Sequence, residues 1–363
     1  MIQGKNVFAS TGGIVLVGLV IGLIASMLQH FGNPGNMGIC VACFERDIAG
    51  AIGLHRAAIV QYLRPEIIGL VLGAFAASII FGDFRPRGGS APVQRFILGM
   101  LAVIGALVFL GCPWRALLRL AGGDWNAIVG LVGLGCGIFV GTLFLRNGFS
   151  LGSSSRQNAF TGYIFPLVMV GLLILYLMFP QAEGQPQSGV LFYSVSGPGS
   201  MHAPLLLSLG CGLLIGFLAQ RSRFCTMGAL RDLFLFRQLH LMFGVVALVA
   251  AAFAANLYFG QFNPGFLNQP VAHNDWLWNF SGMLMAGLAF ALAGGCPGRQ
   301  LFMSGEGDSD AAIFALGMIA GAAVSHNFGL ASSGAGAGPN GPLAVGIGLA
   351  ILLVIGFANR QKA

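Results

Sequence analysis

Ten apolar runs of roughly 17 to 20 residues follow one another along the chain, each about the length that an α-helix needs to cross a bilayer. They lie near 12–29, 66–82, 95–111, 127–145, 163–179, 204–220, 241–260, 279–295, 311–327 and 342–358. The fifth and sixth runs are separated by a stretch rich in Gly, Pro, Gln and Ser that contains no Lys or Arg. The pattern predicts a first membrane unit over 1–180, a polar connector over 181–203 and a second membrane unit over 204–363.

The two membrane units share a sequence repeat. Gly111-Cys112-Pro113-x-Arg115 recurs 184 residues later as Gly295-Cys296-Pro297-x-Arg299. Further matches at offsets of 184 or 185 pair Asp124 with Asp308, Gly133 and Gly137 with Gly317 and Gly321, Cys40 with Cys225, and Arg46-Asp47 with Arg231-Asp232. Because five spans is an odd number, the second copy of this duplicated unit is expected to lie upside down in the membrane. The predicted fold is an all-α polytopic membrane helical bundle of inverted five-span repeats with short re-entrant helices.

Composition supports a membrane protein. The 363 residues are 56% hydrophobic and only 8% charged, and the mean hydropathy is +0.83. A soluble domain is normally about a quarter charged. The net charge of +7 comes from scattered arginines rather than a basic patch, which argues against nucleic acid as a partner. The first apolar run is interpreted as a membrane span and not as a cleavable signal.

The positions of the arginines predict the topology. The connectors 180–203, 261–278 and 328–341 contain no Lys or Arg and are expected outside. The segment with Arg221, Arg223, Arg231 and Arg237 is expected to be cytoplasmic, as are both termini. The outer side of the first unit would then carry several arginines, which re-entrant segments could hold.

The repeated Gly-Cys-Pro-x-Arg motif carries the candidate chemistry. Proline suits the first turn of a helix, so each Cys-Pro is expected to start a short helix whose N-terminal amides favour an anion. Gly111 and Gly295 would let the backbone approach a ligand. Arg115 and Arg299 would pair with the aspartate nine residues later or face an anion, and for Arg299 pairing near Asp308 is favoured. The simpler interpretation is a helix break with cysteine as a small buried residue.

The other cysteines differ in what they indicate. Cys40 and Cys43 form a Cys-x-x-Cys, a pattern typical of a redox pair or a soft metal site. Only Cys40 has a counterpart, Cys225, so these two join Cys112 and Cys296 as candidates, and the role of Cys43 stays open. Cys136 and Cys211 are expected at helix contacts. Arg46-Asp47 and Arg231-Asp232 are expected to be ion pairs that fix the short helices. No metal site, cofactor fingerprint or catalytic triad is found in the sequence, so an enzyme is not expected.

The Gly-Cys-Pro-x-Arg motifs, the Cys40 and Cys225 segments and the repeat resemble the YeeE/YedE family of sulfur-transport membrane proteins. The resemblance implies a bacterial inner-membrane protein, narrow at its middle, whose cysteines pass thiosulfate inward. The residues of this chain that match those cysteines are Cys112 and Cys296, together with Cys40. Length and the Cys40-x-x-Cys43 segment look closest to the YedE branch linked to selenium metabolism, which implies a selenium compound and a small cytoplasmic carrier protein of the TusA type.

Three functional hypotheses follow. The first is a permease for a small sulfur- or selenium-containing anion that moves along cysteine thiols. The second is a membrane thiol oxidoreductase that uses Cys40 and Cys43. The third is a membrane subunit that anchors a soluble enzyme, although the short inner loops argue against it.

Overall fold

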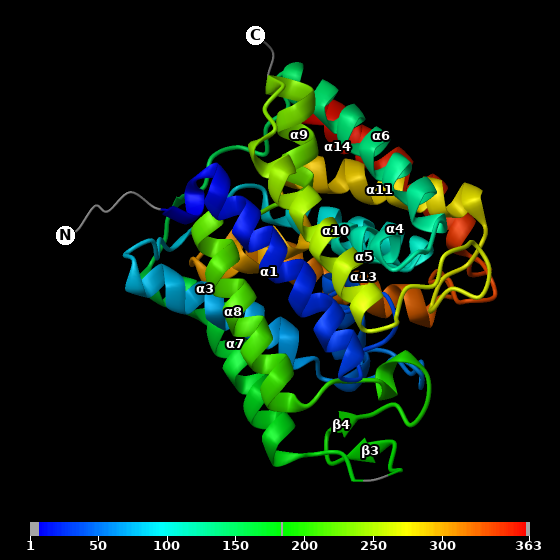
Figure 1. The fold of residues 1–363 in the computed structure, drawn as a ribbon. Coiled ribbons are helices and arrows are strands. Elements are labelled where there is room, and N and C mark those ends of the chain that lie inside the picture. Colours follow the sequence, from blue (N-terminus) through cyan, green and yellow to red (C-terminus); the bar gives the residue numbers. More distant parts are fainter. Residues whose placement is uncertain (1–6, 183, 361–363) are drawn as a thin grey trace.

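The computed structural model of the chain describes residues 7–182 and 184–360, which are almost entirely helical (Figure 1). The α-helices are α1 (Thr11–His30), α2 (Val41–Ala51), α3 (Pro65–Ile80), α4 (Pro92–Phe109), α5 (Pro113–Ala121), α6 (Asn126–Arg146), α7 (Ala159–Met178), α8 (Leu205–Ser222), α9 (Thr226–Phe236), α10 (His240–Tyr258), α11 (Trp276–Ala293), α12 (Pro297–Gly305), α13 (Ser309–Asn327) and α14 (Gly341–Ala358). Two 3₁₀ helices are η1 (Val7–Ala9) and η2 (Pro198–Ser200). Two short antiparallel pairs join β1 (Arg87–Gly88) to β2 (Ser155–Arg156) and β3 (Gln187–Ser188) to β4 (Leu191–Phe192).

All ten apolar runs form helices. Nine segments of the described residues are long and apolar enough to cross a membrane. The tenth run forms α3, whose 16 residues make it a shorter apolar helix. At about 1.5 Å per residue, α3 rises less than the roughly 30 Å of a hydrocarbon core. The predicted fold class, a polytopic helical membrane bundle, is confirmed. The termini predicted to be cytoplasmic lie partly outside the described residues, at 1–6 and 361–363.

Helices from the two halves of the chain pack against each other in matching pairs. α1 packs on α10 and α3 packs on α8, which are copies of one contact if α1 corresponds to α8 and α3 to α10. In the same way, α6 packs on α11 and α13 packs on α4. Figure 1 shows α1 in the middle of the molecule beside α8 and α10. The halves are therefore intertwined, while the division at the connector and the inversion in the membrane stay predictions.

Repeat-related glycines bring these helices close together. A side chain on Gly133 of α6 would strike the carbonyl oxygen of Phe280 in α11. At the equivalent contact, a side chain on Gly317 of α13 would strike the carbonyl oxygen of Phe96 in α4. Small residues permit such close backbone contact between helices in lipid, where the hydrophobic effect gives little drive for association. The glycine repeat is thus explained by packing.

We expect Gly133→Val to destabilise the protein and Gly135→Val to leave it nearly unchanged. Both positions lie in α6, but a side chain at Gly135 would meet nothing within 4 Å. Overpacking costs about 1–3 kcal/mol or more, whereas the helix propensity of valine is the same at both positions. Thermal unfolding in detergent measures the difference. Equal losses in the two variants would contradict the account of this contact.

Candidate functional site

Four short helices each begin at a cysteine, as the sequence predicts for the two Cys-Pro motifs. The N-cap residues are Cys40 for α2, Cys112 for α5, Cys225 for α9 and Cys296 for α12. Pro113 and Pro297 occupy the first helical positions, where the missing N–H removes no hydrogen bond of the helix. The first backbone amides of a helix have no partner within it, so these helix starts can accept a polar ligand.

The four cysteines form two pairs. The Sγ atoms of Cys40 and Cys112 lie 3.8 Å apart, and this is named the outer thiol pair from its predicted side. The Sγ atoms of Cys225 and Cys296 lie 3.6 Å apart and form the inner thiol pair. A disulfide requires about 2.05 Å, so both pairs consist of free thiols. The structure brings together the two motifs within each half of the chain, which the sequence matches did not show.

One thiol of each pair caps its own helix. The Cys40 Sγ accepts a hydrogen bond from the Cys43 backbone N–H at 3.4 Å, and the Cys225 Sγ accepts one from the Gly228 N–H at 3.2 Å. Cys112 and Cys296 make no such capping bond, although each begins a helix. Both thiols are buried at the starts of their helices. Cys43 contributes its backbone N–H to this cap, which Gly228 also supplies in the second copy, and its Sγ lies 3.7 Å from Nη1 of Arg115.

Arg115 closes the outer thiol pair. Its guanidinium is fully buried and donates to the carbonyl oxygens of Leu110, Pro270 and Val271, and to that of Asn36. These carbonyls belong to the end of α4, the loop before α2 and the loop before α11. One side chain thus fastens three segments together beside two cysteines whose exposed fractions are 0% and 1%.

The predicted approach of a ligand to the backbone at Gly111 and Gly295 stays a prediction, and the structure shows what surrounds each glycine. A side chain at Gly111 would meet the Arg115 side chain, and one at Gly295 would meet Arg299. Each glycine therefore makes room for the arginine of its own motif.

Through Cys225, the inner thiol pair borders a cavity of about 470 Å³, named the inner vestibule. Cys225, which is 6% exposed, lies in its wall. Arg223, Arg231 and Arg299 also line it, together with Asp232. The vestibule therefore has an excess of positive charge and suits a small anion. Arg223, a residue that the sequence analysis used only for topology, has a left-handed backbone with φ of 56° at the end of α8.

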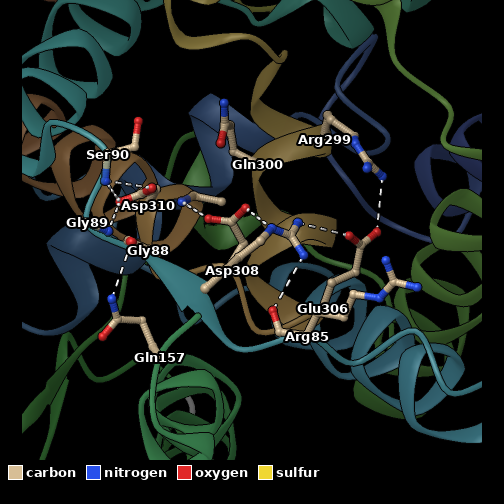
Figure 2. Close-up of polar contacts among 12 residues, drawn as sticks. Arg85, Gly88, Gly89, Ser90, Gln157, Arg299, Gln300, Glu306, Asp308 and Asp310 are labelled. Atoms are coloured by element: carbon tan, nitrogen blue, oxygen red, sulfur yellow. Dashed lines mark hydrogen bonds and ion pairs between the residues drawn. The ribbon is translucent and has the colours of Figure 1, made fainter. Parts of the chain in front are cut away.

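Arg299 is part of an ion network behind the vestibule (Figure 2). It pairs with Glu306 at 3.3 Å, and Asp308 pairs instead with Arg87 at 2.8 Å. The predicted pairing of Arg299 near Asp308 is therefore wrong. Arg87 also reaches Glu306 at 3.4 Å, so the loop before α4 is fastened to the end of α12. Arg299 therefore pairs with Glu306 and also lines the vestibule.

The predicted pairing of Arg115 with Asp124 is also wrong. Asp124 pairs with Arg119 at 2.6 Å, and both side chains are fully buried. Arg115 already points toward the backbone carbonyls that it fastens, whereas Arg119 lies one helical turn further along α5 and reaches Asp124. Asp124 also accepts a bond from the backbone N–H of Asn126 at 3.0 Å, which positions the start of α6.

The two Arg-Asp pairs exist but are not equivalent. Arg46 and Asp47 are 2.7 Å apart with side chains 2% and 0% exposed, while Arg231 and Asp232 are 2.8 Å apart and 33% and 20% exposed.

Arg64, which the sequence predictions did not include, makes a second ion pair with Asp47 at 2.7 Å. The same guanidinium donates to two carbonyls of the connector, in Pro198 and Met201. The sequence feature that could have identified Arg64 is its position directly before Pro65, at the start of an apolar helix.

The remaining cysteines and the buried His273 lie outside the two thiol pairs. Cys211 is buried in α8 and Cys136 is exposed on α6. His273 donates through Nε2 to the Val108 carbonyl at 2.8 Å, and burial lowers its pKa. Within residues 7–182 and 184–360 no cluster of three His, Cys, Asp or Glu side chains could hold a metal ion.

Residues 221–356 match the protein family described as Sulphur transport. The thiosulfate transporter TsuA of Escherichia coli (strain K12) is 32% identical to the chain over 107 residues, which cover 30% of each protein. The matched region therefore spans about a third of this curated relative. Both descriptions name transport rather than catalysis, in agreement with the expectation that the chain is not an enzyme.

The nine long apolar helices of the described residues define a multi-pass membrane protein, and it holds two pairs of neighbouring thiols. The similarity to sulfur transport proteins lies in the second half of the chain.

We expect Asp47→Asn to destabilise the protein far more than the repeat-equivalent Asp232→Asn. The first change leaves Arg46 and Arg64 buried without their counter-ion, and breaking a buried ion pair costs about 3–5 kcal/mol. The second affects a partly exposed pair, for which about 1 kcal/mol or less is typical. Thermal unfolding in detergent compares the two. Similar losses would contradict the structural role of Asp47.

Proposed function

We propose that the chain is a permease for a small sulfur-containing anion, which passes from the outer to the inner thiol pair. The observation that carries this proposal is the pair of repeat-related thiol sites at helix N-termini, one of which opens into an arginine-lined vestibule. Thiosulfate is the first substrate to test, because the relative TsuA is a thiosulfate transporter. A selenium compound of the same class is the alternative substrate.

The chemistry of the two thiol pairs suits a soft anion. Free S–H groups donate weak hydrogen bonds to a polarisable sulfur or selenium atom. The positive ends of α5 and α12 offset part of the cost of removing water from the anion. The nearby Arg115 directs its charge to backbone carbonyls, so the outer pair lacks a free cation that would trap the anion. Weak sites in series permit exit as well as entry.

In this proposal, the state described by the structure is the one open toward the cytoplasm. The vestibule lies beside Arg223 and Arg231, on the side that the positive-inside rule assigns to the cytoplasm. The outer pair is closed by Arg115, so entry from outside requires the loop before α11 to release that side chain. In a bacterial inner membrane, a small carrier protein of the TusA type would receive the anion at the vestibule.

Uptake of labelled thiosulfate by cells that lack their own thiosulfate uptake tests the proposal. Cys112→Ala and Cys296→Ala are each expected to lower uptake about tenfold or more, because each removes a thiol contact to a charged ligand. Cys136→Ala is the matched control, since this cysteine is exposed on α6 away from both pairs. Competition by unlabelled selenite compares the two substrate classes.

Wild-type uptake in both Cys112→Ala and Cys296→Ala would sink the thiol pathway. Loss confined to Cys43→Ala would favour the oxidoreductase hypothesis instead.

A further inference from the structure

Trp114 occupies the variable position of the first Gly-Cys-Pro-x-Arg motif, two residues after Cys112 in α5. At the offset of 184, its counterpart in the second motif is Gly298, two residues after Cys296. The largest side chain in one copy therefore corresponds to no side chain in the other. It is the one position within these motifs where the two copies differ so strongly in size.

The Trp114 ring extends from α5, the helix of Cys112, to residues around the inner thiol pair. Its centroid is 5.9 Å from that of Phe224, the residue before Cys225, and 6.1 Å from that of Phe302 in α12. A Cβ atom on Gly298 would be 3.2 Å from Cζ2 of the indole. The ring thus starts from the helix of Cys112 and fills the space left empty by Gly298, against residues that neighbour both cysteines of the inner pair in the chain.

The indole N–H of Trp114 is a buried donor without a partner among the described residues. The side chain is only 2% exposed. Cε2, the ring atom bonded to this nitrogen, is 3.4 Å from the Cβ position at Gly298, so this part of the indole lies against the start of α12. Buried donors are nearly always paired, and leaving one unpaired costs free energy. An N–H that is retained here is suited to a ligand that is present only part of the time.

We propose that Trp114 is the barrier between the outer and inner thiol pairs, and that its indole N–H donates to the anion that crosses it. This rests on the proposed function. The ring separates two sites that must not be open at once, and it must move aside for the anion to pass. A neutral N–H donor binds an anion without holding it as tightly as a fixed charge would.

The barrier is tested by thiol labelling, which does not require transport. In full-length variants with Cys112 as the only cysteine, a membrane-impermeant methanethiosulfonate carrying a sulfonate group is added to the vestibule side of inside-out membrane vesicles. Cys112 is expected to be protected when Trp114 is present. Trp114→Ala is expected to raise its labelling rate about tenfold or more, because the removed indole leaves a gap that water and reagent can enter.

Trp125→Ala is the control, because Trp125 follows α5 but its side chain is 42% exposed. It is expected to leave Cys112 protected. The amount of full-length protein in the membrane and the labelling rate of Cys225 in a matching variant report whether Trp114→Ala still folds. If Cys112 is labelled equally slowly in the variant that retains Trp114 and in a folded Trp114→Ala variant, the assignment of Trp114 as the barrier is overturned.

The role of the N–H is tested with Trp114→Phe, which keeps an aromatic ring and removes the donor. Thiosulfate uptake is expected to fall about tenfold, as for loss of one hydrogen bond to a charged group, while Cys112 stays protected in the labelling assay. Trp125→Phe serves as the control and should transport normally. Wild-type uptake by Trp114→Phe would overturn the assignment of the N–H. Absence of both thiosulfate and selenite uptake by the wild type would reject the proposed function, but labelling would still test the barrier.

Discussion

A helix that begins inside a membrane exposes backbone N–H groups to a region without water, and this fold is arranged around four such helix starts. Two of them are capped by the thiols of Cys40 and Cys225, and the other two begin with Cys-Pro. The starts meet in pairs, which places thiols and amide dipoles together in a buried, polar site. Ion pairs behind the short helices and glycine contacts between the long helices hold these starts in position.

The two repeats share this plan but differ in ways that matter for function. Arg115 fastens the outer loops over one thiol pair, whereas its counterpart Arg299 pairs with Glu306 and lines an open vestibule. Trp114 fills the middle of the molecule where its counterpart Gly298 has no side chain. In the proposed pathway, these differences close the outer pair while the inner pair borders the vestibule.

The sequence predicted the helical membrane fold, the repeat and the start of short helices at Cys-Pro, because these depend on local hydrophobicity and on proline geometry. It could not predict that Cys40 meets Cys112, since repeat matches identify equivalent residues and not neighbours in space. The Arg-Asp spacing of nine was misleading for a similar reason. Arg119 supplies the partner of Asp124, but Met303 stands at its equivalent position, so Arg87 from a distant loop pairs with Asp308.

The central claim is that a chalcogen anion contacts both thiol pairs on its way through the protein. An experimental structure of the protein with bound selenosulfate tests it most directly, because the anomalous scattering of selenium marks the position of the anion. The account predicts selenium peaks in contact with Sγ of Cys112, of Cys296 or of both, beside the Trp114 indole. Selenium bound only elsewhere, with both thiol pairs empty at saturating ligand, would contradict it.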